Sequence, residues 1–238
     1  MSRNWMVVVA IPLVLACSGD RPPDRDEAAV TSVGIYVLPY YEAAATPGGR
    51  PMVAVGRAFD GLLASNDRRD ILRVRNMIQA EPEYVTPMTL MVLAIRLYDV
   101  GQRDEAVFWF YVARDRFATM AAVLDLGAPA LAQPADAMLS FNTLAGPIIN
   151  GYAFCDPNRQ RELRRDALEW VEQSPYQAVF TAQLPARPGD RQTNLNRAIA
   201  ELRAAADEEG HYLEDPANLA EFNRLRAENR AGEKYCWT

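Results

Sequence analysis

From residue 51 onward, proline and glycine interrupt a chain whose apolar residues recur at helical spacing, and this alternation most constrains the fold. Apolar side chains that return about every 3.6 residues indicate helices with one buried face. Proline cannot continue a helix and glycine commonly ends one, so each interruption separates two helices. The sequence therefore predicts a mainly α domain of antiparallel helical hairpins, because the connections between the helices are short.

The expected helices lie between these interruptions. They cover residues 51–65, 67–80, 87–100, 104–126, 135–152, 157–173, 192–209 and 215–230. Pro134 is expected to belong to a break, and Gly146-Pro147 should split or kink the helix that contains it. Residues 31–41 (TSVGIYVLPYY) are rich in β-branched and aromatic side chains, which predicts a short extended segment before the first helix.

One stretch has the pattern of a known helical repeat. Residues 89–117 (TLMVLAIRLYDVGQRDEAVFWFYVARDRF) resemble a tetratricopeptide or Sel1-like hairpin. The residues at its packing and turn positions are Leu93, Ala94, Leu97, Gly101, Ala106, Phe110 and Ala113. The resemblance implies that two small alanines lie where the helices cross and that Phe110 fills the space toward the next element. Ala118 stands where the repeat usually has proline, and no second clear copy follows, so the resemblance covers one hairpin.

Two further segments, DEAVFWFYVARDRF and GPIINGYAFCDP, resemble those of uncharacterised bacterial envelope proteins, which implies kinship without an activity. Within the first, residues 107–112 (VFWFYV) are apolar on every face of the expected helix. Such a helix is usually buried between layers. The alternative is an aromatic groove that receives a peptide.

The amino terminus carries a short apolar run. Arg3 precedes residues 6–16, an 11-residue stretch without charge that is too short to span a bilayer and typical of a signal peptide. The run ends in LVLAC, at residues 13–17, and resembles the lipobox of bacterial lipoproteins. This resemblance implies that residues 1–16 are removed and that Cys17 carries lipid. Cleavage near Ser18 without lipid, or an uncleaved anchor, are the alternatives.

The next segment is expected to tether the domain to the membrane. Residues 17–30 include the charged, proline-containing stretch DRPPDRD, which cannot bury enough apolar surface to fold alone. The remaining residues, 31–238, are expected to form a single helical domain. Ser18 occupies the position where aspartate retains enteric lipoproteins at the inner membrane. The resemblance therefore implies an envelope protein that faces the periplasm, with the outer membrane favoured over the inner.

Two cysteines remain if Cys17 is lipidated. Cys155 and Cys236 form an even pair in a compartment that oxidises thiols, which makes them a candidate disulfide. Two separate buried thiols are the alternative. A bond would fasten the carboxyl-terminal tail to the middle of the domain.

Charge and chemistry exclude several classes of function. The net charge of −6 disfavours nucleic acid as a partner, because basic patches supply that affinity. His211 is the only histidine, and it is expected in a turn between two polar helices. No spacing of histidine, cysteine and carboxylate is typical of zinc, and no nucleophile elbow or phosphate loop is present. The sequence therefore predicts no catalytic residues, no metal and no cofactor.

Three functions remain as hypotheses. The first is a non-enzymatic lipoprotein whose helical domain binds or scaffolds a protein partner and is anchored to the membrane by lipid. The second is a small-ligand or lipid carrier with a cavity lined by Phe108, Trp109 and Tyr111. The third is a peptidoglycan-acting hydrolase, which needs two acidic side chains that face each other across a cleft.

Overall fold

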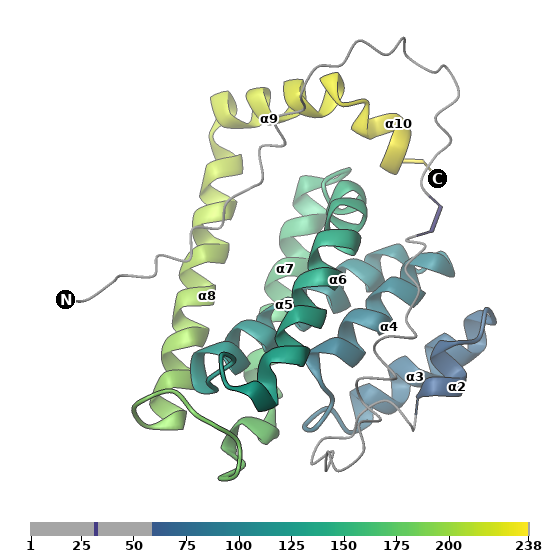
Figure 1. Ribbon diagram of the computed structural model, residues 1–238. Helices are drawn as coiled ribbons and strands as arrows, with labels where there is room; N and C mark the ends of the chain where they lie inside the picture. Colours follow the sequence, from purple (N-terminus) through teal and green to yellow (C-terminus); the bar gives the residue numbers. More distant parts are fainter. Residues whose placement is uncertain (1–30, 33–58, 238) are drawn as a thin grey trace.

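The computed structural model describes residues 31–32 and 59–237, and this part of the chain is mainly α-helical (Figure 1). In chain order the elements are α2 (Asp60–Leu63), α3 (Arg68–Ala80), α4 (Pro87–Asp99), α5 (Arg103–Val123), α6 (Pro129–Ala153), α7 (Pro157–Gln173), the 3₁₀ turn η1 (Gln177–Phe180), α8 (Arg191–Glu214), α9 (Pro216–Glu228) and α10 (Ala231–Tyr235). The mainly α prediction is confirmed.

Side-chain caps explain why several helices begin where they do. The first backbone N–H groups of a helix have no partner within it, and a short polar side chain before the helix can accept from them. The capping side chains of α3, α4, α7, α8 and α9 are Asp67, Thr86, Asp156, Asp190 and Asp215. Three of these helices also begin with proline, whose missing N–H costs nothing at that position.

The turn between α4 and α5 depends on Gly101, which has a left-handed φ of +81°. The N–H of Gly101 donates to the carbonyl of Tyr98 at 3.0 Å, and the N–H of Gln102 donates to the carbonyl of Leu97 at 2.8 Å. This pair of hydrogen bonds ends a helix and uses a residue without a Cβ at the left-handed position. The chain therefore reverses directly into α5.

Helix α5 lies at the centre of the domain and packs against α4, α6, α7 and α8. The six packing residues expected from the hairpin pattern are fully buried: Leu93, Ala94, Leu97, Ala106, Phe110 and Ala113. Residues 107–112 also belong to the core, except that Phe108 is only partly buried. The antiparallel pair α4–α5 therefore forms the main hairpin of the fold.

A smaller apolar cluster lies at the other end of α5. It joins Met120, Val123 and Leu124 to η1 and to Leu195 of α8. Leu124 leaves helical geometry and pairs with Ala186 in an isolated antiparallel bridge. This pairing explains why α5 ends at Val123 and does not continue to residue 126 as expected.

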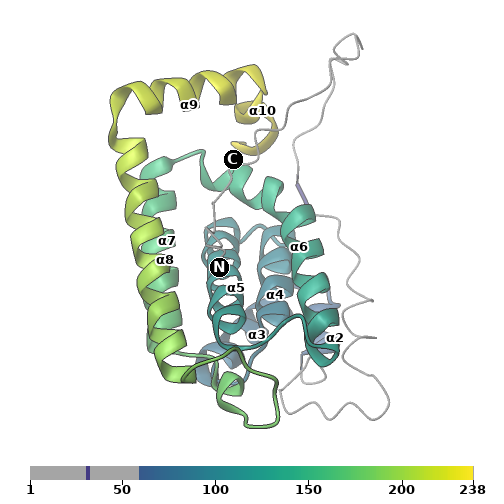
Figure 2. The same cartoon turned by 60° about the vertical axis from the view of Figure 1, so that its left-hand side comes forward.

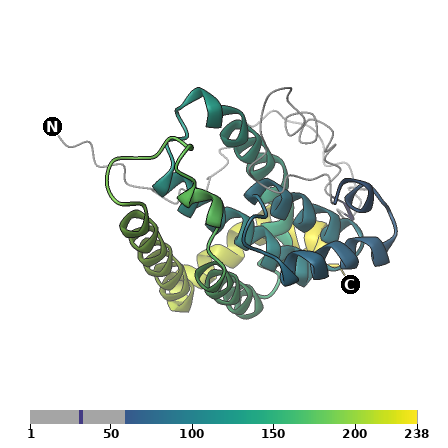
Figure 3. The ribbon, with the colours of Figure 1, turned by 90° about the horizontal axis from the view of Figure 1, so that it is seen from below.

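The last three helices form an angled run at one side and end of the domain (Figures 1 and 2). Helix α8 runs beside α7, as the view from below also shows (Figure 3), and α9 then turns across the end of the domain. The short α10 returns to contact α6. We refer to α9 and α10 together as the carboxyl-terminal arm.

Several expected boundaries are wrong. Helix α6 is continuous through Pro134 and Pro147, because burial of side chains such as Met138 and Ile149 outweighs the backbone hydrogen bonds that the prolines remove. Helix α8 extends to Glu214, and η1 and α10 were not expected. The expected helix 51–65 and the extended segment 31–41 lie largely outside the described residues. Within the described part, α2 (Asp60–Leu63) corresponds to the end of the expected helix.

Candidate functional site

A groove of about 280 Å³ opens between α3, α5 and α7. Its apolar side is formed by Phe108, Trp109 and Leu163, and its polar rim by Arg75, Gln79, Asp104, Glu105 and Arg159. The first turn of α5 supplies the two acids, and the first turn of α7 supplies Arg159. The packing of three helices therefore places both signs of charge around an aromatic floor.

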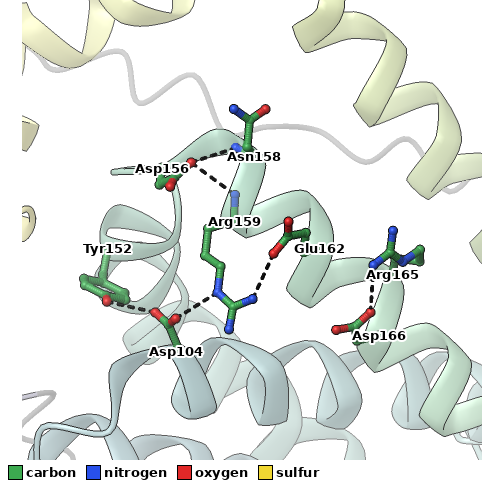
Figure 4. A network of polar contacts seen from close by, with 8 residues as sticks. All are labelled: Asp104, Tyr152, Asp156, Asn158, Arg159, Glu162, Arg165 and Asp166. Atoms are coloured by element: carbon green, nitrogen blue, oxygen red, sulfur yellow. Dashed lines mark hydrogen bonds and ion pairs between the residues drawn. The ribbon is translucent and has the colours of Figure 1, made fainter.

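The rim charges form ion pairs, of which Figure 4 shows the one between Arg159 and Asp104. Arg159 Nε lies 2.9 Å from Asp104 Oδ2, and its Nη1 lies 2.9 Å from Glu162 Oε2. On the other side, Arg75 Nη1 lies 2.7 Å from Glu105 Oε2. Arg159 and Asp104 each leave 44% of the side chain exposed, so this pair contributes only about 0–1 kcal/mol to stability. Replacing this ion pair by pairs with a ligand would therefore cost little free energy.

Tyr152 supports the acid side of this rim from α6. Its hydroxyl donates to Asp104 Oδ1 at 2.9 Å. Burial raises the pKa of Tyr152 to about 12, and the bond to Asp104 acts in the same direction. The hydroxyl is therefore a stable donor at neutral pH. The hydrogen bonds that Arg159 itself donates to Asp104 and to Glu162 raise the pKa of Arg159 above its usual value. Tyr152 and Arg159 therefore keep their protonation states near neutral pH, and the groove can act as a binding surface.

Tyr111 does not line this groove, although Phe108 and Trp109 do. Its hydroxyl instead accepts from Gln160 Nε2 at 2.9 Å, and the same amide donates to Glu209 Oε1 of α8 at 2.9 Å. Burial raises the pKa of Tyr111 to about 12. The three aromatic residues of the expected cavity thus lie in two places.

A buried ion pair lies next to Tyr111. Asp115 of α5 pairs with Arg164 of α7, and their side chains are only 5% and 12% exposed. Burial raises the pKa of Asp115, and Arg164 opposes that shift. Together with Gln160, this pair fastens α5, α7 and α8. Arg164 can be buried because Asp115 compensates its charge.

Arg116 is a buried residue that sequence reasoning missed. It is completely inaccessible, and it donates to the carbonyls of Pro82, Val85 and Ser174. Its guanidinium also lies 4.7 Å from the ring centroid of Trp170. Burial lowers the pKa of Arg116 to about 10, which leaves it charged at neutral pH. Arg116 therefore links the connection between α3 and α4 to the end of α7. In the sequence, the only sign of this role is an arginine within a largely apolar helix.

The carboxyl-terminal arm is fastened to the domain by a disulfide. Cys155 and Cys236 are bonded, with their Cα atoms 5.4 Å apart. Beside them, the guanidinium of Arg103 lies 3.5 Å from the ring centroid of Trp237 and donates to its carbonyl at 3.1 Å. Gly151 permits close approach of α10, because a Cβ there would meet the Tyr235 ring at 2.6 Å.

The remaining candidates lie elsewhere. Cys17 is outside the described residues. His211 is exposed in the last turn of α8 and does not lie in the expected turn. Among the residues that the structure describes, no group of three or more histidine, cysteine or acidic residues could hold a metal ion. No helix within the described ranges combines the length and apolar character needed to cross a membrane.

A second, smaller hollow of about 220 Å³ lies between α7 and the first turns of α8. It is lined by Glu172, Pro175, Gln192, Leu195, Asn196 and Ile199. This hollow lacks the aromatic floor and the opposed rim charges of the first groove.

Comparison with known proteins identifies a relative of this chain. An uncharacterized protein of Haemophilus influenzae is 34% identical over 208 residues, which cover 87% of this chain and 80% of the relative. The chain belongs to the same family as that protein. No family model matches the sequence, and no solved structure matches it.

Proposed function

We propose that this protein is a non-enzymatic lipoprotein of the bacterial envelope whose helical domain holds a partner protein. The groove between α3, α5 and α7 carries the proposal, because its lining is the kind that binds proteins. Aromatic residues and arginine are enriched at the centres of protein interfaces, whereas lysine is depleted. The groove combines the partly exposed ring of Phe108, with the core residue Trp109 beneath it, and two arginines.

The rim specifies the kind of segment that fits. Arg75 and Arg159 present positive charge, and Asp104 and Glu105 present negative charge, on either side of the aromatic floor. A peptide segment with an apolar residue between side chains of opposite sign would replace these internal pairs by pairs of its own. The exchange has little cost because the present pairs are partly exposed.

The size of the groove supports a protein segment over a small molecule as the ligand. Pockets for drug-sized ligands usually hold about 300–1,000 Å³ and enclose most of the ligand. The groove holds about 280 Å³ and lies open between three helices. One or two side chains of a larger partner suit this volume.

Membrane attachment in this proposal is supported by the LVLAC segment at residues 13–17. Intact mass of the membrane-extracted protein tests it. A mature chain that begins at Cys17 with a triacyl adduct, absent from Cys17→Ala, supports the lipoprotein. A chain that begins at Met1 or near Gly19 without lipid contradicts it.

Site-specific photocrosslinking in cells tests partner binding. A photoreactive residue at Gln79, on the rim, is expected to give a discrete adduct with another protein. The same residue at Arg73, exposed on α3 but outside the groove, is the matched control and should give none. Arg159→Glu should abolish the Gln79 adduct, whereas Arg165→Glu, on the same helix away from the groove, should leave it. No discrete adduct from Gln79, or equal adducts from both positions, would refute the proposal.

A further inference from the structure

The disulfide joins two partly exposed residues, each of which follows the last turn of a helix. Cys155 follows α6 and Cys236 follows α10, and both residues are only partly buried. The bond therefore joins the carboxyl-terminal arm to the domain at a place that a reagent in solution can reach.

A cation lies against both sulfur atoms. Arg226 of α9 places Nη2 3.4 Å from Cys236 Sγ and 3.7 Å from Cys155 Sγ. The same nitrogen donates to the carbonyl of Gly151 at 3.1 Å. Within the described part of the chain, no carboxylate forms an ion pair with Arg226. Its charge is consequently available to a thiolate, and a neighbouring cation lowers the pKa of a cysteine thiol.

Hydrogen-bond acceptors are also present for the reduced form. Cys155 Sγ lies 3.5 Å from the carbonyl oxygen of Gly151, and Cys236 Sγ lies 3.8 Å from that of Ala231. A neutral thiol can donate to such an oxygen, whereas a disulfide sulfur has no hydrogen to donate. The two carbonyl oxygens thus favour the neutral thiol, and Arg226 favours a thiolate, most closely that of Cys236.

We propose that Cys155–Cys236 is a redox-active disulfide that exchanges with a dithiol, and that its reduction releases the carboxyl-terminal arm from α6. A thiolate of the dithiol attacks Cys155 Sγ, and the sulfur–sulfur bond breaks toward Cys236, whose thiolate is held by Arg226. The second thiol of the dithiol then attacks the mixed disulfide and releases Cys155. Two electrons pass to the protein, the dithiol becomes a disulfide, and the protons that its two thiols lose are taken up by the protein thiols or by water.

The arm has little else to hold it once the bond opens. No residue of α9 is buried. The arm contacts the domain through the Phe154–Phe222 ring pair and the hydrogen bond from Arg226 to the Gly151 carbonyl. In α10, only Ala231 is buried, and the Tyr235 ring lies against Gly151. Beyond α10, Trp237 stacks on Arg103, and at its other end the arm joins α8 at Asp215. Because these contacts are few and lie at the surface, reduction is expected to let the arm move about the connection at Asp215 while the core remains folded.

Redox titration of the full chain tests the role of Arg226. The protein is equilibrated with mixtures of reduced and oxidised dithiothreitol, and alkylation of the Cys155 and Cys236 peptides is measured by mass spectrometry. The proposal expects Arg226→Met to favour the disulfide about tenfold in the equilibrium constant, or about 30 mV for two electrons. Arg226→Lys, which keeps the charge, should restore most of the difference. Arg224→Met, on the solvated side of α9, is the matched control and should titrate like the wild type.

The direction of this shift separates the proposal from a purely mechanical role. If Arg226 only holds the arm shut through Gly151, its loss would make the disulfide easier to reduce. An unchanged midpoint, or a shift in that direction, would overturn the proposal.

A second test leaves every residue of the described domain unchanged. Thiolate absorbance of the reduced chain, with Cys17→Ala to remove the third thiol, is followed against pH. At least one thiol is expected to ionise well below the ordinary pKa of about 8.5. Two thiols that titrate at or above that value would overturn the proposal. Faster amide exchange in α9 and α10 after reduction, with α4 and α5 unchanged, is expected for release of the arm; unchanged exchange in the arm would refute it.

Discussion

Helices α4 and α9 have the same length and the same start, yet they differ completely in burial. Each has 13 residues and begins with proline after a capping side chain, Thr86 in one and Asp215 in the other. Helix α4 buries eleven residues, whereas α9 buries none. Local sequence signals therefore predict a helix in both cases. The number of apolar side chains in each helix decides whether it is buried in the core or lies at the surface.

The two regions are stabilised by different interactions. The α4–α5 hairpin is held by close packing of apolar side chains, which is the dominant favourable term in folding. The carboxyl-terminal arm is held by a disulfide, one ring pair and contacts of Arg103 and Arg226. The domain is thus expected to lose the arm under conditions that leave the hairpin intact.

The largest expected effect comes from the same substitution made in the two regions. Phe110→Ala empties a site at the centre of the core, where Phe110 is 1% exposed, and should reduce the free energy of unfolding by about 3–5 kcal/mol. Phe222→Ala, on α9, should cost about 1 kcal/mol, because that ring is only partly buried and its main contact is the Phe154 ring. Urea unfolding followed by circular dichroism measures both. Equal losses would show that the arm belongs to the same cooperative unit as the hairpin.

A second test uses the buried pair between α5 and α7. Arg164→Met leaves the carboxyl of Asp115 buried without its cation, which should cost about 3 kcal/mol at neutral pH. Burial raises the pKa of Asp115 above its unfolded value, so the folded state binds the proton more tightly. Stability contributed by the protonated carboxyl is present at low pH and is lost as pH rises through the folded pKa.

The loss in Arg164→Met should therefore shrink as pH falls, and unfolding measured at a series of pH values from neutral into the acid range checks this. The double variant Asp115→Asn/Arg164→Met should show no such dependence. A loss that is constant across this range would mean that the carboxyl is hydrated and not buried.

Particular residues show how far sequence reasoning extends. Thr86, Gly101 and the apolar positions of residues 89–117 predict the central hairpin, because capping, a left-handed glycine and helical spacing act locally. The continuity of α6 through Pro134 could not be predicted, since it depends on packing against other helices. The same holds for the groove, whose rim joins Arg75, Asp104 and Arg159 from separate helices.

A third test removes the covalent link to the arm. Cys155→Ser/Cys236→Ser opens a loop with a sequence separation of 81 residues, for which the chain-entropy model gives about 4 kcal/mol in a domain that unfolds as one unit. If the arm detaches separately, the measured loss for the hairpin should be below about 1 kcal/mol, because core unfolding no longer depends on the link. Amide exchange distinguishes the two cases: protection should fall in α9 and α10 and stay unchanged in α4. A full loss in both regions would break the comparison.

The smallest expected effect concerns the stack of Trp237 on Arg103. A guanidinium over an indole contributes about 0.5–1 kcal/mol when the site is partly exposed, so Arg103→Met should cost about that amount. Because Arg103 also lies 5.6 Å from the Tyr152 centroid, it holds the tail against the residue that supports Asp104 in the groove. Tryptophan fluorescence quenching by iodide should rise in Arg103→Met and stay near the wild-type value in Arg103→Lys. If Trp237 becomes no more accessible in the methionine variant, the disulfide alone fixes the tail, and the contrast between a packed hairpin and a fastened arm becomes sharper still.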